Sequence, residues 1–220
     1  MSEQGQKWAG DAGVEYTERN PHTVDDLETL RREQYGLTQS EIYRDLLGDV
    51  DRDAEILEVG SNVGVQLRCL RQLGFENVVG IDVQSYAIAK SREYSPDIPA
   101  VVGDASRLPF EDDAFDLVFT NGCLVAIPPE LLADVQSEIV RCSREYVLGS
   151  EFYADEYVEI DSDHDEQLYW KTDFRRHYRE NHDLETVRSR FLHYDETDNK
   201  DEIFLLRKAD ARTDDETDSA

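Results

Sequence analysis

Segments with strand patterns and segments with helix patterns alternate along most of the chain. Short apolar runs are each followed by a stretch in which apolar residues recur at helical spacing, as Val63, Leu67, Leu70 and Leu73 do before Gly74. This alternation is typical of a parallel sheet that helices cover on both faces. It predicts strands at 55–59, 77–81, 100–102, 115–120 and 145–149, with helices at 63–73, 85–94 and 128–142.

The two ends of the chain add further elements. The N-terminal region reads as helical, and Thr38 and Glu41 have the spacing of a capping box, which predicts a helix over 38–47 that Gly48 ends. After an expected acidic loop at 155–166, a helix near 172–181 precedes two strands, 186–193 and 202–207, that should pair antiparallel. The acidic tail from Ala209 is expected to be disordered.

These elements predict three parts: an N-terminal helical segment (1–48), an α/β domain (49–208) and a disordered acidic tail (209–220). A chain of 220 residues with 39% hydrophobic residues suits one packed domain. The expected fold is a Rossmann-like, doubly wound sheet of seven strands with an antiparallel C-terminal strand pair.

Nothing in the sequence suggests export or a membrane. The N-terminus is polar, and no stretch approaches the roughly 18 apolar residues that a membrane span needs. Cys69, Cys123 and Cys142 are unevenly spaced, without a C-x-x-C pair or a neighbouring histidine. We therefore expect a soluble, cytoplasmic protein without a metal site.

The charge balance is unusual, because 50 acidic residues face 23 basic ones and give a formal net charge of -27. The acids are spread along the whole chain, which resembles the proteins of halophiles, where molar salt screens charges within about 3 Å. The alternative is an acidic protein from an ordinary habitat. No basic patch indicates nucleic acid as a partner.

A glycine turn, Glu58 to Gly64, follows the first predicted strand. Gly60 and Gly64 lack side chains, and Asn62 readily adopts left-handed conformations, so the backbone near Ser61 can approach a ligand closely. The spacing differs from the G-x-G-x-x-G of dinucleotide enzymes, which disfavours a pyrophosphate ligand. Glu58 places a carboxylate where it can bind an ammonium group. The alternative is an ordinary turn between a strand and a helix.

Acidic residues also follow the next two strands. Asp82, beside Val83, lies 24 residues after Glu58 at the end of the second strand, where a carboxylate accepts hydrogen bonds from both hydroxyls of a ribose. Asp104, between Gly103 and Ala105 after the third strand, can bind the amino group of adenine; the alternative is a surface acid.

Thr120 and Asn121 emerge from the fourth strand and complete a series of groups at successive strand ends. This ordered series is similar to the motifs of class I methyltransferases. The resemblance implies S-adenosylmethionine as the cofactor, with its sulfonium beside Thr120 and Asn121.

A closer resemblance covers most of residues 8–207. The chain resembles the methylases associated with pseudaminic acid biosynthesis in the turn already described and in four further segments: Trp8-Ala9-Gly10, Tyr16 to Asn20, Arg141-Cys142-Ser143 and Glu151-Phe152-Tyr153. The resemblance implies an acceptor sugar of the nonulosonic acid type. It also implies that the N-terminal segment forms a lid in which Tyr16 and Arg19 cover the methionine carboxylate.

Two departures from this family concern the acceptor. Ala126 stands where these methylases tend to carry a histidine, which excludes an imidazole at that place. A basic segment of the family is replaced by Ser162-Asp163-His164, which would repel an anionic sugar. The acceptor is therefore expected to differ.

An oxygen acceptor has to lose a proton, and Glu151 and Tyr153, placed just beyond the fifth strand, are the expected acid or base residues. The alternative for Glu151 is a solvated surface acid. His164 is more simply a surface residue and Cys123 a small packing residue.

Three classes of function remain open from the sequence. We expect a methyltransferase acting on a small polar metabolite. The alternatives are transfer to protein or RNA, and binding of the cofactor without turnover. An RNA enzyme should show a basic face, and none is visible in the sequence.

Overall fold

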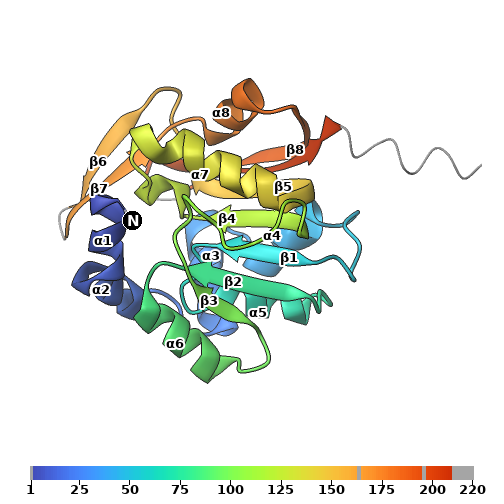
Figure 1. Ribbon diagram of the computed structural model, residues 1–220, viewed down its shortest axis with the longest axis horizontal. Coiled ribbons are helices and arrows are strands. Elements are labelled where there is room, and N and C mark those ends of the chain that lie inside the picture. Colours follow the sequence, from blue (N-terminus) through green and yellow to red (C-terminus); the bar gives the residue numbers. More distant parts are fainter. Residues whose placement is uncertain (1, 163–164, 195–196, 210–220) are drawn as a thin grey trace, which may run out of the picture.

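The computed structural model describes residues 2–162, 165–194 and 197–209. Seven strands form one twisted sheet in the order β3-β2-β1-β4-β5-β9-β8 (Figure 1). The strands are β1 (Ile56–Val59), β2 (Val78–Asp82), β3 (Ala100–Val102), β4 (Phe115–Asn121), β5 (Ser143–Phe152), β8 (Leu184–His193) and β9 (Lys200–Lys208). The first five pair in parallel, and β9 runs antiparallel to both β5 and β8. The expected fold is confirmed.

Helices pack on both faces of this sheet (Figure 1). They are α1 (Glu3–Ala9), α2 (Asp11–Arg19), α3 (Val24–Tyr35), α4 (Gln39–Leu46), α5 (Val65–Gln72), α6 (Ser85–Tyr94), the 3₁₀ turn η1 (Leu124–Ala126), α7 (Pro129–Cys142) and α8 (Phe174–Asn181). Side chains of α3, α4 and α5 bury one face of the sheet, and side chains of α7 and α8 bury the other. The Thr38 capping box at the start of α4 is present.

The N-terminal segment has two different environments. Leu27 of α3 and Tyr43 of α4 are buried in the same core cluster as Leu67 and Phe119, so these helices are part of the packed domain. Helices α1 and α2 bury few residues of their own and lie across one end of the sheet (Figure 1).

The acidic loop expected at 155–166 is a wrong prediction. A hairpin of β6 (Val158–Ser162) and β7 (Asp165–Lys171) forms a separate two-stranded sheet there. In this hairpin Ile160 pairs with Tyr169, and η1 packs against β7. The alternation of apolar and acidic residues at Val158, Glu159 and Ile160 is a strand pattern that the density of acids concealed.

Two expectations fall wholly or partly outside the described residues: the disordered tail, since 210–220 are not described, and the roles given to Asp163 and His164. Among the residues that are described, no helix has the length and apolar character needed to cross a bilayer.

Candidate functional site

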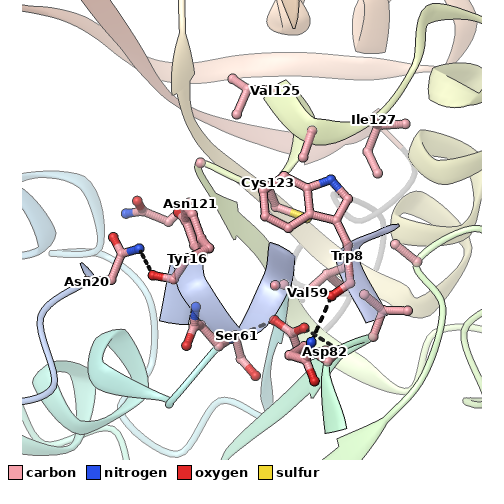
Figure 2. A pocket seen from close by; sticks show the side chains of 18 of the residues that line it. Trp8, Tyr16, Asn20, Val59, Ser61, Asp82, Asn121, Cys123, Val125 and Ile127 are labelled. Carbon is pink, nitrogen blue, oxygen red and sulfur yellow. Dashed lines mark hydrogen bonds between the residues drawn. The ribbon is translucent and has the colours of Figure 1, made fainter. Parts of the chain in front are cut away.

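A cavity of about 540 Å³ opens at the carboxyl ends of β1, β2, β3 and β4. The carboxyl ends of parallel strands meet at one edge of a sheet, which is where ligands bind in doubly wound folds. Helices α1, α2 and α3 line the cavity from the side, and Ile160 and Tyr169 of the hairpin contribute to its wall. Figure 2 shows Trp8 and Tyr16 facing Ser61 and Asp82 across this space.

The turn after β1 has the backbone conformation that the sequence predicted. Gly60, Asn62 and Gly64 have φ values of 77°, 46° and 70°. The amides of Gly60 and Ser61 both donate to the carbonyl of Ile81, at 2.8 and 3.0 Å, which fixes the turn against β2.

The two glycines of the turn are required for different reasons. A Cβ on Gly60 would lie 2.5 Å from the Cys123 Sγ, and Gly60 lines the cavity. A Cβ on Gly64 would meet the Ser91 Oγ of α6 at 2.8 Å, and Gly64 is not among the lining residues. Gly64 therefore serves the packing of the turn against α6.

Glu58 reaches the cavity from β1 with only 2% of its surface exposed. Its Oε2 atom has no hydrogen-bond partner in the protein. Burial, followed by repulsion from Asp82, raises the pKa of Glu58 well above its ordinary value. A cation placed beside this carboxylate would offset both effects.

Asp82 is held rigidly at the end of β2. Its two carboxylate oxygens accept hydrogen bonds from the backbone amides of Asn62 and Gln84, each at 2.8 Å. Burial raises the pKa of Asp82, and these amide bonds oppose the rise. A carboxylate offers about four acceptor positions, so it can still bind hydroxyl groups in the cavity.

The end of β3 supplies the next part of the wall, with Gly103, Asp104 and Ala105 all lining the cavity together with Val83. The Asp104 Oδ1 accepts from the amide and the hydroxyl of Ser106, at 3.0 and 2.8 Å. These bonds fix the direction in which the carboxylate points.

Of the two residues predicted at the end of β4, only one lines the cavity. Asn121 lines the cavity, and its Oδ1 accepts a hydrogen bond of 3.0 Å from the Arg31 Nη2. Thr120 is buried at 1% exposure and is not among the lining residues.

Of the two N-terminal residues predicted to cover the methionine carboxylate, again only one lines the cavity. Tyr16 lines the cavity, where burial raises its pKa and its ring packs edge-on against Trp8 at 5.3 Å. Arg19 is not among the lining residues; with His22 and Asp26 it borders a surface hollow that adjoins the cavity at Asn20, Pro21 and Leu30.

Glu151 lies within β5 and not beyond it, because β9 pairs with β5 as far as Phe152. Only 2% of Glu151 is exposed, so the alternative of a solvated surface acid is wrong. Its carboxylate accepts from the Cys123 amide at 3.3 Å and from the amides of Leu124 and Val125, and it therefore holds η1 in place. Burial raises the pKa of Glu151 to about 7.

Tyr153 lies on the outer side of this strand end, away from the lining residues. Its hydroxyl donates to Asp155 at 2.8 Å, and this bond raises its pKa to about 12. Glu151 and Tyr153 both lie outside the cavity lining, whereas Cys123 packs in its wall.

Several cavity residues were missed by sequence reasoning. Gln84 donates from its side chain to the carbonyls of Trp8 and Gly10, at 3.0 and 2.8 Å, and so fastens the N-terminal helices to the end of β2. Arg31, Tyr194 and Asp201 line the far part of the cavity. No short motif marks these last three residues, because they come from α3 and from the C-terminal strand pair and its connection.

Buried polar atoms without a protein partner gather on this cavity. Among the described residues they include the Trp8 Nε1, the Glu58 Oε2, the Ser61 Oγ, the Asn62 Oδ1 and the Asn121 Nδ2. Buried polar groups are normally hydrogen-bonded. Their concentration here fits a polar ligand that offers both donors and acceptors.

Comparison with known proteins agrees with this arrangement. Residues 57–145 match the family model described as Methyltransferase domain. The chain is 30% identical to 24-methylenesterol C-methyltransferase 2 of Arabidopsis thaliana over 122 residues, which are 48% of this chain and 33% of the relative. The matched part spans about a third to two fifths of the lengths of such curated relatives.

Solved structures extend the likeness over nearly the whole chain. A magnesium protoporphyrin IX methyltransferase from Synechocystis with bound S-adenosylmethionine superposes with a TM-score of 0.68, at 11% identity, covering 95% of this chain and 99% of that one. A 1,6-didemethyltoxoflavin-N1-methyltransferase from Burkholderia thailandensis, with bound 1,6-didemethyltoxoflavin and S-adenosylhomocysteine, superposes at 0.61 with 19% identity, covering 77% and 76%. The chain therefore has the class I methyltransferase fold.

Proposed function

We propose that this protein is an S-adenosylmethionine-dependent methyltransferase that acts on a small molecule. The observation that carries the proposal is the series of groups from successive strand ends that line one cavity: Glu58 and the glycine turn, then Asp82, then Asp104 and Ala105, then Asn121. The methyltransferase match over residues 57–145 supports the same activity.

The residues present fit the cofactor. The unpaired Oε2 of Glu58 suits the α-ammonium group, Asp82 suits the ribose hydroxyls, and Asp104 with the amide of Ala105 suits the adenine edge. When bound, S-adenosylmethionine supplies a methyl group activated by its sulfonium. The protein then has to orient the acceptor and limit the access of water, and the side chains of α1, α2 and α3 that line the cavity contribute to both.

Arg31 is our assignment for the α-carboxylate of the cofactor. It lines the cavity and touches Asn121, whereas Arg19 borders an adjoining hollow and does not line the cavity. Within the part of the chain that the structure describes, Arg31 donates to neutral oxygens, those of Gln39, Gln34, Tyr35 and Asn121. An anionic group beside this guanidinium would gain a charge-assisted hydrogen bond.

The acceptor we favour is small because the cavity, of about 540 Å³, has the size of a small-molecule site and is bordered by α1, α2, α3 and the β6–β7 hairpin. The resemblance of the sequence to pseudaminic-acid-associated methylases supports a sugar of the nonulosonic acid type, although Ala126, in the wall, replaces the family's histidine. The spread of acids behind the net charge of -27 supports a protein from a halophile, and the sequence offers no basic patch that would support RNA as a partner.

Calorimetry in high salt tests the cofactor assignment. We expect S-adenosylhomocysteine to bind and NAD to bind at least tenfold more weakly, because the turn does not provide the close approach of a pyrophosphate. Binding of NAD without binding of S-adenosylhomocysteine would overturn the proposed function.

A further inference from the structure

A second polar cluster borders the cavity next to Arg31 and has no role in the cofactor assignment. It consists of Asp201, the second residue of β9, together with Tyr35 at the end of α3 and Tyr194 just after β8. Asp201 and Tyr194 line the cavity, beside Ser150 and Phe152.

The hydroxyls of both tyrosines are directed at the Asp201 carboxylate. Tyr35 donates to its Oδ2 in a short hydrogen bond, and Tyr194 donates to the same oxygen at 3.3 Å. The two rings pack edge-on with centroids 5.1 Å apart, and the Arg31 Nη1 donates to the Tyr35 hydroxyl at 3.3 Å. Packing and hydrogen bonds therefore fix the position of the carboxylate.

Asp201 is a buried acid without a direct counter-ion. Its exposure is 6%, and among the described residues no lysine or arginine forms an ion pair with it. Burial raises its pKa, which the tyrosine hydroxyls and the more distant charges of Arg31 and Lys171 oppose. The two tyrosine hydroxyls offset part of the cost of burying this group, and a hydrogen-bond donor from a ligand would offset more of it.

Among the described residues, the cavity lining contains four carboxylates: Glu58, Asp82, Asp104 and Asp201. Glu58 lies in β1, Asp82 ends β2 and Asp104 follows β3, and the proposed function uses all three for the cofactor. Asp201 comes from β9, on the side of the cavity formed by β4 and β5, and has no part in that assignment.

We propose that Asp201, held by Tyr35 and Tyr194, is the binding site for a hydroxyl or amino group of the methyl acceptor. This inference rests on the proposed function and narrows its substrate class to acceptors that donate a hydrogen bond. An O–H or N–H group bound there has its proton directed at a carboxylate with free acceptor positions. An acceptor without such a group lacks this contact.

A pair of isosteric probes tests the subsite without knowledge of the natural acceptor. Phenol and toluene differ only by a hydroxyl in place of a methyl group, and their binding is measured by ligand-observed NMR titration with and without S-adenosylhomocysteine. We expect phenol to bind the wild type at least about fivefold more tightly than toluene, since one hydrogen bond contributes that much.

Two variants and a matched control localise the effect. Asp201→Leu should bring the phenol-to-toluene ratio to about one, and Asp201→Asn should lower it at least about threefold, because a neutral acceptor is weaker than a charged one. Glu202→Gln makes the same isosteric change on the next residue, whose carboxylate instead pairs with Arg175 at 2.6 Å, and should keep the wild-type ratio.

The ratio separates a binding role from a structural one, because a disturbed cavity weakens both probes together. A wild type without preference for phenol, or Asp201 variants that keep it, would overturn the subsite. So would variants that lose S-adenosylhomocysteine affinity while keeping the ratio, since Asp201 would then belong to the cofactor site. If the wild type fails to bind S-adenosylhomocysteine, the proposed function fails, and the ratio measured without it still decides the subsite.

Discussion

Replacing Arg31 by methionine removes the guanidinium from the cavity and keeps a long apolar stem. An arginine has five N–H donors, and four of those of Arg31 are used by Gln39, Gln34, Tyr35 and Asn121. One N–H of Nη2 remains for a ligand. A single charge-assisted hydrogen bond to the carboxylate of the cofactor is worth about 1.5 to 3 kcal/mol, which corresponds to about tenfold to about 150-fold in affinity.

The assay compares two ligands in the same variant. S-adenosylhomocysteine carries the amino acid group, and 5′-methylthioadenosine lacks it while keeping the nucleoside. Calorimetry should show that Arg31→Met weakens S-adenosylhomocysteine by at least about tenfold and changes 5′-methylthioadenosine by less than about threefold. The difference isolates the carboxylate from any general change in the cavity.

Arg19→Met is the matched control, because the resemblance gave Arg19 the same role and the structure places it beside an adjoining hollow, outside the cavity lining. It should leave the affinity ratio of the two ligands unchanged. Equal losses for both ligands in Arg31→Met would show that Arg31 only supports α3 and Asn121. If only Arg19→Met lost affinity for S-adenosylhomocysteine, the carboxylate would be bound by Arg19 and not by Arg31.

Three further outcomes are expected. Asp82→Ala should weaken S-adenosylhomocysteine at least tenfold in calorimetry, because two ribose hydrogen bonds of about 1.5 to 3 kcal/mol each are lost; an unchanged affinity contradicts the ribose role. Glu151 has a folded pKa of about 7 against an ordinary 4.5. Its protonated form is therefore favoured by folding, and stability should fall by up to about 3 kcal/mol as pH rises through that window. Chemical denaturation measured over this pH range should show that Glu151→Gln lacks the fall. Identical pH profiles for the wild type and the variant would refute this prediction. With a net charge of -27, sodium chloride below 1 M should raise the melting temperature by several degrees, and a melting curve unaffected between about 0.05 and 2 M would refute the halophilic interpretation.

The cofactor side of the cavity was largely predictable from the sequence. Glu58, Gly60, Asp82 and Asp104 lie on the ends of consecutive parallel strands, so their order along the chain is also their order in space. The positive φ of Asn62 follows from its side chain and its place between two glycines.

The remaining polar residues in and around the cavity were not predictable in the same way. Arg31, Tyr35, Tyr194 and Asp201 come from α3, the end of β8 and β9, and no local spacing relates them. The antiparallel insertion of β9 between β5 and β8 brings Asp201 opposite Phe152 and next to the cavity. The same pairing extends β5 and buries Glu151, which in the sequence looks like one acid among many.

By itself, the sequence determined the alternating elements, the glycine turn and the acids at the strand ends, because each depends on residues close together in the chain. Only the tertiary structure decided which polar side chains share a cavity. It turned an acidic stretch into the β6–β7 hairpin, separated Arg19 from the cavity and placed Arg31 in it, and enclosed Asp201 beside two tyrosines. The physical reason is that burial and partnership depend on which distant segments pack together, and local patterns carry no record of that packing.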